Sequence, residues 1–120
     1  MLAVGGHVLG GAEQQLVRLT TGLSGGLGST KQEMCGALSS GVLLIGALFG
    51  RNHVGEDDQL ALELAARYRE RFLAELGTTH CQSLYDEVHS ASGLGSCAMV
   101  VERAARILVE VLREGQGLRS

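Results

Sequence analysis

The chain has 120 residues, which suits one domain, and a helical domain of this size can bury a sizeable core without disulfides or metals. Apolar residues make up 45% of the chain and charged residues 19%, so the composition is that of a globular protein and excludes extensive disorder. The formal net charge of -3 and the lack of any Lys/Arg run exclude nucleic acid and an anionic membrane surface as expected partners.

Targeting and membrane signals are missing from the sequence. It begins Met-Leu-Ala-Val-Gly-Gly-His, without the basic region and cleavage site of a secretory signal. The longest apolar stretch, Val42 to Phe49, is far shorter than the ~20 residues that span a bilayer. We therefore expect a cytoplasmic protein in a reducing compartment. Its three cysteines, an odd number, then indicate free thiols, ligands or catalytic groups rather than a disulfide framework.

Two short helices are predicted before a glycine-rich loop. Residues 2–9 are apolar and resemble the end of a helix whose beginning is missing. Residues 12–21 carry apolar side chains at helical spacing among Glu, Gln and Arg, which predicts a short amphipathic helix. The glycine-rich loop at 22–28 ends this helix. We expect the loop to bring two helices together, and binding of an anion by its backbone amides is the weaker alternative.

A long apolar helix is predicted next, over residues 31–49. Thr30 and Glu33 have the spacing of a capping box, in which each side chain bonds a free amide at the other's position. The helix is apolar nearly all round, which is typical of a central, buried helix. Four small residues would let a neighbouring backbone approach closely at one end: Gly36, Ala37, Ser40 and Gly41.

The clearest amphipathic helix follows. Asp57 and Asp58 supply negative charge where the dipole at a helix N-terminus favours it. An apolar residue then recurs every four positions, at Leu60, Leu64, Tyr68, Phe72 and Leu76. Gly77 is the natural residue to end the helix, because glycine readily adopts the left-handed conformation of a helix C-cap.

Two further helices complete the chain. Thr79 and Gln82 form a second capping-box pair, which predicts a short helix at about 80–88. Ser96 can cap the last helix, and the tail at 115–120 is expected to fray.

No segment shows the alternation of a half-buried strand, and aromatic residues are only 3% of the chain. We therefore predict an all-α fold, a compact single-domain bundle of about five to six helices around the central helix near 31–49. The one domain covers residues 1–120.

The three cysteines fall near predicted helix starts. Cys81 lies two residues after Thr79, Cys97 directly follows Ser96, and Cys35 is in the second turn of its helix. The positive end of a helix dipole favours a thiolate over a thiol, although by only roughly 0.3–1 kcal/mol. For any single cysteine, a role as a small buried apolar residue is an equal alternative. With three so placed, we predict that at least two meet in space as a redox pair or a shared ligand set.

The histidines give little support for a metal site. His80 precedes Cys81 and could serve as a metal ligand or an electrostatic partner, but an exposed polar residue in a first turn is the favoured interpretation. His7, His53 and His89 lack metal-ligand spacing. The haem-attachment pattern Cys-x-x-Cys-His and the thioredoxin-type Cys-x-x-Cys are both absent. Any cooperation among the cysteines must therefore come from the tertiary fold.

At residues 25–41, Gly-Gly-Leu-Gly-Ser-Thr-Lys-Gln-Glu-Met-Cys-Gly-Ala-Leu-Ser-Ser-Gly, the chain resembles the C_GCAxxG_C_C family of redox-active proteins. That family has a glycine-rich loop, a Cys-Gly-Ala-x-x-Gly helix start, a charged amphipathic helix and two later cysteines, here Cys81 and Cys97. This order covers nearly all of the chain. Ser40 stands where the motif has glycine, with Gly41 next to it, and this exchange of small residues leaves the packing intact.

The resemblance implies a helical bacterial or archaeal protein with a redox role through four cysteines, of which three are carried onto Cys35, Cys81 and Cys97. The family's first cysteine has no counterpart and would fall at or before Met1, so the N-terminus is either truncated or this member works with three. Four thiolates can hold an iron–sulfur cluster or a zinc ion, whereas three need His80, water or another chain as the fourth ligand.

The leading functional hypothesis is a redox protein of one of two kinds. In one, Cys35 and either Cys81 or Cys97 cycle between dithiol and disulfide with a redox partner, whose identity the sequence leaves open. In the other, the three cysteines ligate an iron–sulfur or other metal centre. The competing class is a helical interaction or assembly module with structural cysteines, and the small core leads us to expect a homodimer. An enzyme acting on a small molecule is a third class, for which no nucleophile–base pair or cofactor motif is present.

Overall fold

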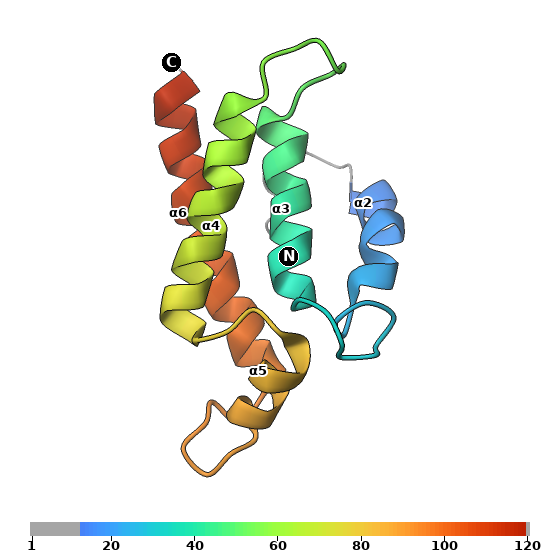
Figure 1. The fold of residues 1–120 in the computed structure, drawn as a ribbon, viewed down its shortest axis with the longest axis vertical. Helices are drawn as coiled ribbons and strands as arrows, with labels where there is room; N and C mark the ends of the chain where they lie inside the picture. The colour runs from blue at the N-terminus through green and yellow to red at the C-terminus, as the bar shows by residue number, and fades with distance from the viewer. Residues whose placement is uncertain (1–12, 120) are drawn as a thin grey trace.

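The computed structural model describes residues 13–119, and every regular element in this range is a helix (Figure 1). The predicted all-α fold is therefore confirmed. The elements in chain order are α2 (Glu13–Thr20), the 3-10 helix η1 (Thr21–Leu23), α3 (Gly36–Phe49), α4 (Gln59–Leu76), α5 (Cys81–Val88) and α6 (Cys97–Arg119). The helix predicted at 2–9 lies outside the described residues. No helix between Glu13 and Arg119 has the length and apolar character needed to cross a bilayer.

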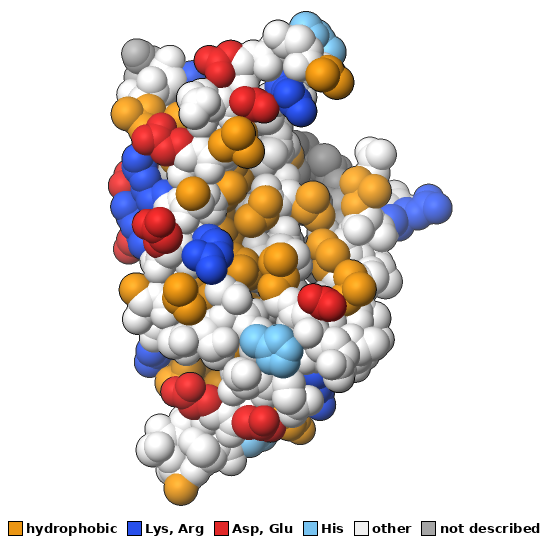
Figure 2. Space-filling model, in the orientation of Figure 1, with side chains coloured by type: hydrophobic (Ala, Val, Ile, Leu, Met, Phe, Trp, Pro, Cys, Tyr) orange, Lys and Arg blue, Asp and Glu red, His pale blue; other side chains and the backbone are white. Residues whose placement is uncertain are grey.

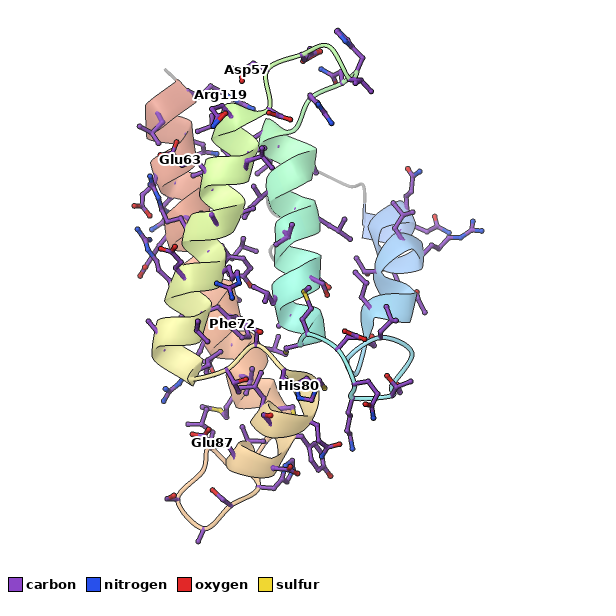
Figure 3. All side chains as sticks on the ribbon, viewed as in Figure 1. Asp57, Glu63, Phe72, His80, Glu87 and Arg119 are labelled. Atoms are coloured by element: carbon purple, nitrogen blue, oxygen red, sulfur yellow. The ribbon has the colours of Figure 1, made fainter. Side chains whose placement is uncertain are left out.

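The core is formed where α3, α4 and α6 pack against one another, three helices that Figure 1 shows side by side. The predicted stripe of α4 faces this core: Leu64, Tyr68 and Phe72 are completely buried. In Figure 3 the labelled Phe72 lies among these helices. Gly77 ends α4 with φ 86°, so the predicted left-handed C-cap is also confirmed. Burying large side chains at regular spacing provides most of the free energy that holds the three helices together.

The small residues of α3 let the ring of Tyr68 approach its backbone. A Cβ atom at Gly41 would lie 2.5 Å from Cε2 of Tyr68, closer than carbon atoms can pack. The Tyr68 hydroxyl donates a hydrogen bond of 3.0 Å to the carbonyl oxygen of Ala37. This contact ties the buried face of α4 to the first turn of α3, directly after Cys35.

The start of α3 differs from the prediction. The helix begins at Gly36 with Cys35 as its N-cap, five residues after the predicted start. Thr30 does not cap it, because its hydroxyl donates to the carbonyl oxygens of Gly26 and Leu27. Residues 24–34 form turns instead, in which three non-glycine residues adopt positive φ, namely Leu27, Ser29 and Lys31.

The end of α6 also differs from the prediction. The helix continues to Arg119, so residues 115–119 are helical where a frayed tail was expected. Gly115 is buried because its backbone packs against Leu64 and Phe49, where a side chain would clash. The Arg119 guanidinium lies 4.4 Å from the centre of the Phe49 ring and donates to the carbonyl oxygen of Leu48. These contacts stabilise a segment whose composition alone does not favour a helix.

Candidate functional site: a cavity lined by three cysteines

Cys35 and Cys81 are brought together by a short backbone pairing. Met34 and His80 form an isolated antiparallel β-bridge between the segment before α3 and the segment before α5. On either side of it, the Cys35 amide donates to Thr79 (2.8 Å) and the Cys81 amide donates to Glu33 (2.9 Å). In this register Cys35 and Cys81 are diagonal neighbours on the same face of the pairing. The bridge therefore places the two cysteines next to each other, although they are 46 positions apart in the sequence.

The glycine-rich loop lies directly against Cys81. A Cβ atom at Gly26 would be 2.6 Å from the Cβ of Cys81, and the φ of Gly26 is +70°. The carbonyl oxygen of Lys31 accepts a hydrogen bond of 3.1 Å from the Gln82 amide, in the first turn of α5. The predicted structural role of the loop, bringing helices together beside Cys35, is therefore supported by these contacts. Only glycine combines this backbone conformation with this close approach.

Of the two remaining predicted N-caps, Ser96 is confirmed and Thr79 is wrong. Ser96 does cap α6, because its hydroxyl oxygen accepts a hydrogen bond of 3.1 Å from the Ala98 amide, and Cys97 is the first helical residue. Thr79 does not cap α5, which begins at Cys81 with His80 as its N-cap. In a capping box the Thr79 side chain would accept a hydrogen bond from the Gln82 amide. That amide donates instead to the backbone carbonyl oxygen of Lys31. All three cysteines thus lie at the N-cap or the first residue of a helix.

The three cysteines line one cavity of about 280 Å³. It lies between the loop after η1 and the N-terminal turns of α3, α5 and α6. Cys97 is exposed, whereas Cys35 and Cys81 are half-buried, and all three are free thiols. The remaining wall is made of small and aliphatic residues together with two serines: Ser24, Gly25, Gly36, Ala37, Ser40, Leu84, Val100 and Val101.

The surroundings of Cys35 and Cys81 raise the pKa of each thiol in some ways and lower it in others. Burial raises the pKa of Cys35, while the nearby amides of Ala37 and Leu38 at the start of α3 act in the opposite direction. Burial also raises the pKa of Cys81, and negative charge on Cys97 would raise it further. The ammonium group of Lys31 lowers it. The thiols are therefore close enough to influence one another's ionisation.

His80 is not directed toward the thiols. Its Nε2 lies 3.0 Å from the carbonyl oxygen of Gln32 and its Nδ1 lies 3.3 Å from the hydroxyl oxygen of Ser83. Figure 3 shows it at the connection between α4 and α5. Within residues 13–119, no three His, Cys, Asp or Glu side chains are grouped so that they could hold a metal ion. The ligand set of three cysteines, with or without His80, therefore stays a prediction from the sequence.

The family model described as "Putative redox-active protein (C_GCAxxG_C_C)" matches residues 1–111. The chain belongs to this family. The match includes the cysteine cavity and all but the last turns of α6, so the family resemblance expected from residues 25–41 and the two later cysteines is confirmed. No curated protein and no solved structure matches the chain.

Lys31 is a neighbour of the site that no sequence motif had indicated. Its ammonium lies 3.8 Å from the centre of the Tyr85 ring, and its backbone carbonyl is bonded to the residue after Cys81. Lys31 is the sole lysine in the sequence, and it lies four residues before Cys35. The nearness of a single lysine to Cys35 in the sequence could have drawn attention to it, but its electrostatic effect on Cys81 depends on the tertiary fold.

Replacing Lys31 with Gln should raise the pKa of Cys81, because the nearby positive charge that favours the thiolate is lost. The measurement is the pH dependence of Cys81 alkylation by iodoacetamide, followed on the peptide that contains it. The midpoint should move to higher pH in Lys31→Gln and stay near the wild-type value in Lys31→Arg, which keeps the charge. An unchanged midpoint in Lys31→Gln would contradict the assigned electrostatic effect.

Stability in alkaline solution should depend on Cys35. Burial raises its pKa above the ordinary value of 9.0, so the folded protein holds this proton more tightly than the unfolded chain does. The contribution to stability is complete below pH 9 and is lost as the pH rises through the folded-state pKa. In urea unfolding between pH 7 and pH 10, wild type should therefore lose more stability than Cys35→Ala. Parallel pH profiles for the two proteins would contradict this assignment.

Proposed function

We propose that this member of the redox-active family works by thiol–disulfide exchange in the cysteine cavity. The single observation that carries the proposal is the convergence of three free thiols from three helix starts on one cavity. A helix N-terminus favours a thiolate, and the thiolate is the form that attacks a disulfide. The reaction needs thiols that are kept reduced, which agrees with the cytoplasmic location expected from the sequence.

Cys97 is the attacking thiol in this proposal, because it is the exposed one. Its thiolate attacks one sulfur of a substrate disulfide, a mixed disulfide forms, and the first substrate thiolate leaves and takes up a proton. The Cys81 thiolate then attacks the sulfur of Cys97, the Cys81–Cys97 disulfide forms, and the second substrate thiolate leaves. The substrate gains two electrons, the two cysteines lose them, and a partner dithiol returns them by the reverse exchange.

Cys81 is assigned as the resolving thiol because of its place in the cavity wall. It starts α5, which packs against α6, and Cys97 starts α6. Cys35 is the N-cap of α3, whose first turn is tied to α4 by the hydrogen bond from the Tyr68 hydroxyl to Ala37. Cys35 therefore stays a thiol in this scheme and forms the inner wall of the cavity.

Disulfide mapping after oxidation tests the proposal. The oxidant is diamide, an uncharged azo compound that takes up two electrons as two thiols form a disulfide. Cleavage after glutamate puts each cysteine on its own peptide, because Glu56 and Glu75 separate Cys35 from Cys81 and Glu87 separates Cys81 from Cys97. We expect one linked pair, Cys81 with Cys97. A link to Cys35 would contradict the assigned resolving thiol, and three unlinked cysteines would contradict the redox function.

The exposed side of α3 favours a second candidate, a helical assembly module that associates with a second copy. Val42 and Leu43 of α3 are 36% and 42% exposed, and Leu62 of α4 is 58% exposed. Figure 2 shows apolar side chains gathered over the middle of the displayed face. If assembly were the whole function, a variant with all three cysteines changed to Ala would sediment as wild type does, and neither protein would reduce disulfides. Thiol exchange instead predicts that this variant loses all disulfide-reducing activity.

A further inference from the structure

The wall of the cysteine cavity is uncharged. Apart from the thiols, the side chains on it are aliphatic, including Ala37, Leu84, Val100 and Val101, or carry a hydroxyl, as Ser24 and Ser40 do. No Asp, Glu, Lys, Arg or His contributes to it among the described residues. A group that enters this cavity meets alkyl groups, hydroxyls and the backbone at the helix starts, but no side chain that carries a fixed charge.

The cavity is also small. Its volume of about 280 Å³ lies below the range of about 300–1,000 Å³ that is typical of sites for drug-sized ligands. It accommodates a short chain of a few heavy atoms attached to sulfur.

A charged substrate arm would find no side chain of opposite charge in the cavity wall. A carboxylate would lose its hydration without gaining a cation, and it would also meet the negative charge of the attacking thiolate. Lys31, the cation assigned to Cys81, keeps its ammonium over the Tyr85 ring and is not part of the wall. An ammonium arm would be attracted by the thiolate but would still lose its hydration against aliphatic side chains.

We infer that the substrate of the cysteine cavity is a small, uncharged disulfide, one arm of which packs against Leu84 and Val101 while its sulfur meets Cys97. This inference rests on the proposed thiol–disulfide exchange and names the class of its substrate. The chemistry is the exchange already described: two substrate thiols form as the Cys81–Cys97 disulfide forms, and a partner dithiol restores the reduced protein.

Three small disulfides that differ mainly in charge test the inference. They are bis(2-hydroxyethyl) disulfide, which is neutral, dithiodiglycolate, which is anionic, and cystamine, which is cationic. For each reagent, the rate of thiol loss from the reduced protein is divided by the rate at which the same reagent reacts with a free neutral thiol, N-acetylcysteine amide. This division removes the differences in intrinsic reactivity among the three disulfides. The normalised rate for the neutral reagent should exceed both others by about tenfold or more, because only this reagent enters without losing the hydration of a charge.

A positive charge placed on the cavity wall should weaken the preference for the neutral disulfide over the anionic one. In Val101→Lys the normalised rate for dithiodiglycolate should rise relative to the neutral reagent, because a cation then faces the carboxylate. Leu118→Lys adds the same charge to an exposed position at the far end of α6 and should leave the preference as in wild type. Equal normalised rates for the three reagents in wild type, or an unchanged preference in Val101→Lys, would overturn the inference alone. No thiol loss with any of the three or with diamide would overturn the proposed function itself.

Discussion

A Cys81→Ser variant should stop at a mixed disulfide on Cys97 when it is treated with bis(2-hydroxyethyl) disulfide. The attacking thiol is intact, but the thiol that displaces the second half of the reagent is gone. Wild type should pass through this adduct quickly and end without it, so the adduct should rise from almost none to about one per chain. The mass of the intact protein, followed by the masses of the peptides released by cleavage after glutamate, measures both the amount and the position of the adduct.

Two matched variants make this prediction specific. Cys97→Ser should form little adduct, because the remaining thiols are half-buried. Cys35→Ser should behave as wild type and end with the Cys81–Cys97 disulfide. The account would be contradicted if Cys81→Ser still completed an internal disulfide, since Cys35 would then be the resolving thiol.

The largest expected effect on stability is that of Gly41→Ala. The new methyl group would lie 2.5 Å from Cε2 of Tyr68, so the ring must move out of a fully packed core. That movement also breaks the bond from the Tyr68 hydroxyl to Ala37 and leaves both groups buried without a partner. The free energy of unfolding should fall by about 2–4 kcal/mol, which urea denaturation measures.

Gly46→Ala in the same helix provides the control for this prediction. A Cβ atom at Gly46 would have no neighbour within 4 Å, and Gly46 is exposed. Alanine should therefore raise the free energy of unfolding by about 0.5–1 kcal/mol, because it loses less conformational freedom than glycine on forming a helix. Effects of the same sign at both positions would show that the contact with Tyr68 does not limit the packing of α3.

The fold followed from the sequence where the signal was local and strongly periodic. The four-residue repeat of α4 is a property of one helix, and its members Leu64 and Tyr68 are buried as the repeat requires. The C-cap at Gly77 and the N-cap at Ser96 are equally local, since each depends on one residue and the amides beside it.

The errors arose where contacts distant in the sequence decide the local structure. The pair Thr30 and Glu33 has capping-box spacing, but the backbone before Cys35 pairs with the 79–82 segment instead of joining the helix. The glycines after Glu114 suggest a frayed end, yet Gly115 provides the space in which Phe49 and Leu64 pack.

The candidate site was predictable in its residues but not in its geometry. Cys35, Cys81 and Cys97 could be selected because each stands near a helix start and fits a family motif. The proximity of Cys35 and Cys81 depends on the Met34–His80 bridge, which carries no sequence pattern of its own. The same bridge brings His80 next to Gln32, and His80 is exposed, as the favoured interpretation of this residue expected.

The most direct test of the central claim is a free-thiol titration of the wild-type protein before and after diamide, with the mass of the chain followed in parallel. The chain contains three cysteines, all of them free in the structure. If the cavity is a thiol–disulfide site, the count should fall from three to one while the protein keeps the mass of a single chain, and a dithiol reductant should restore it to three. A count that stays at three under both oxidant and reductant would contradict the account.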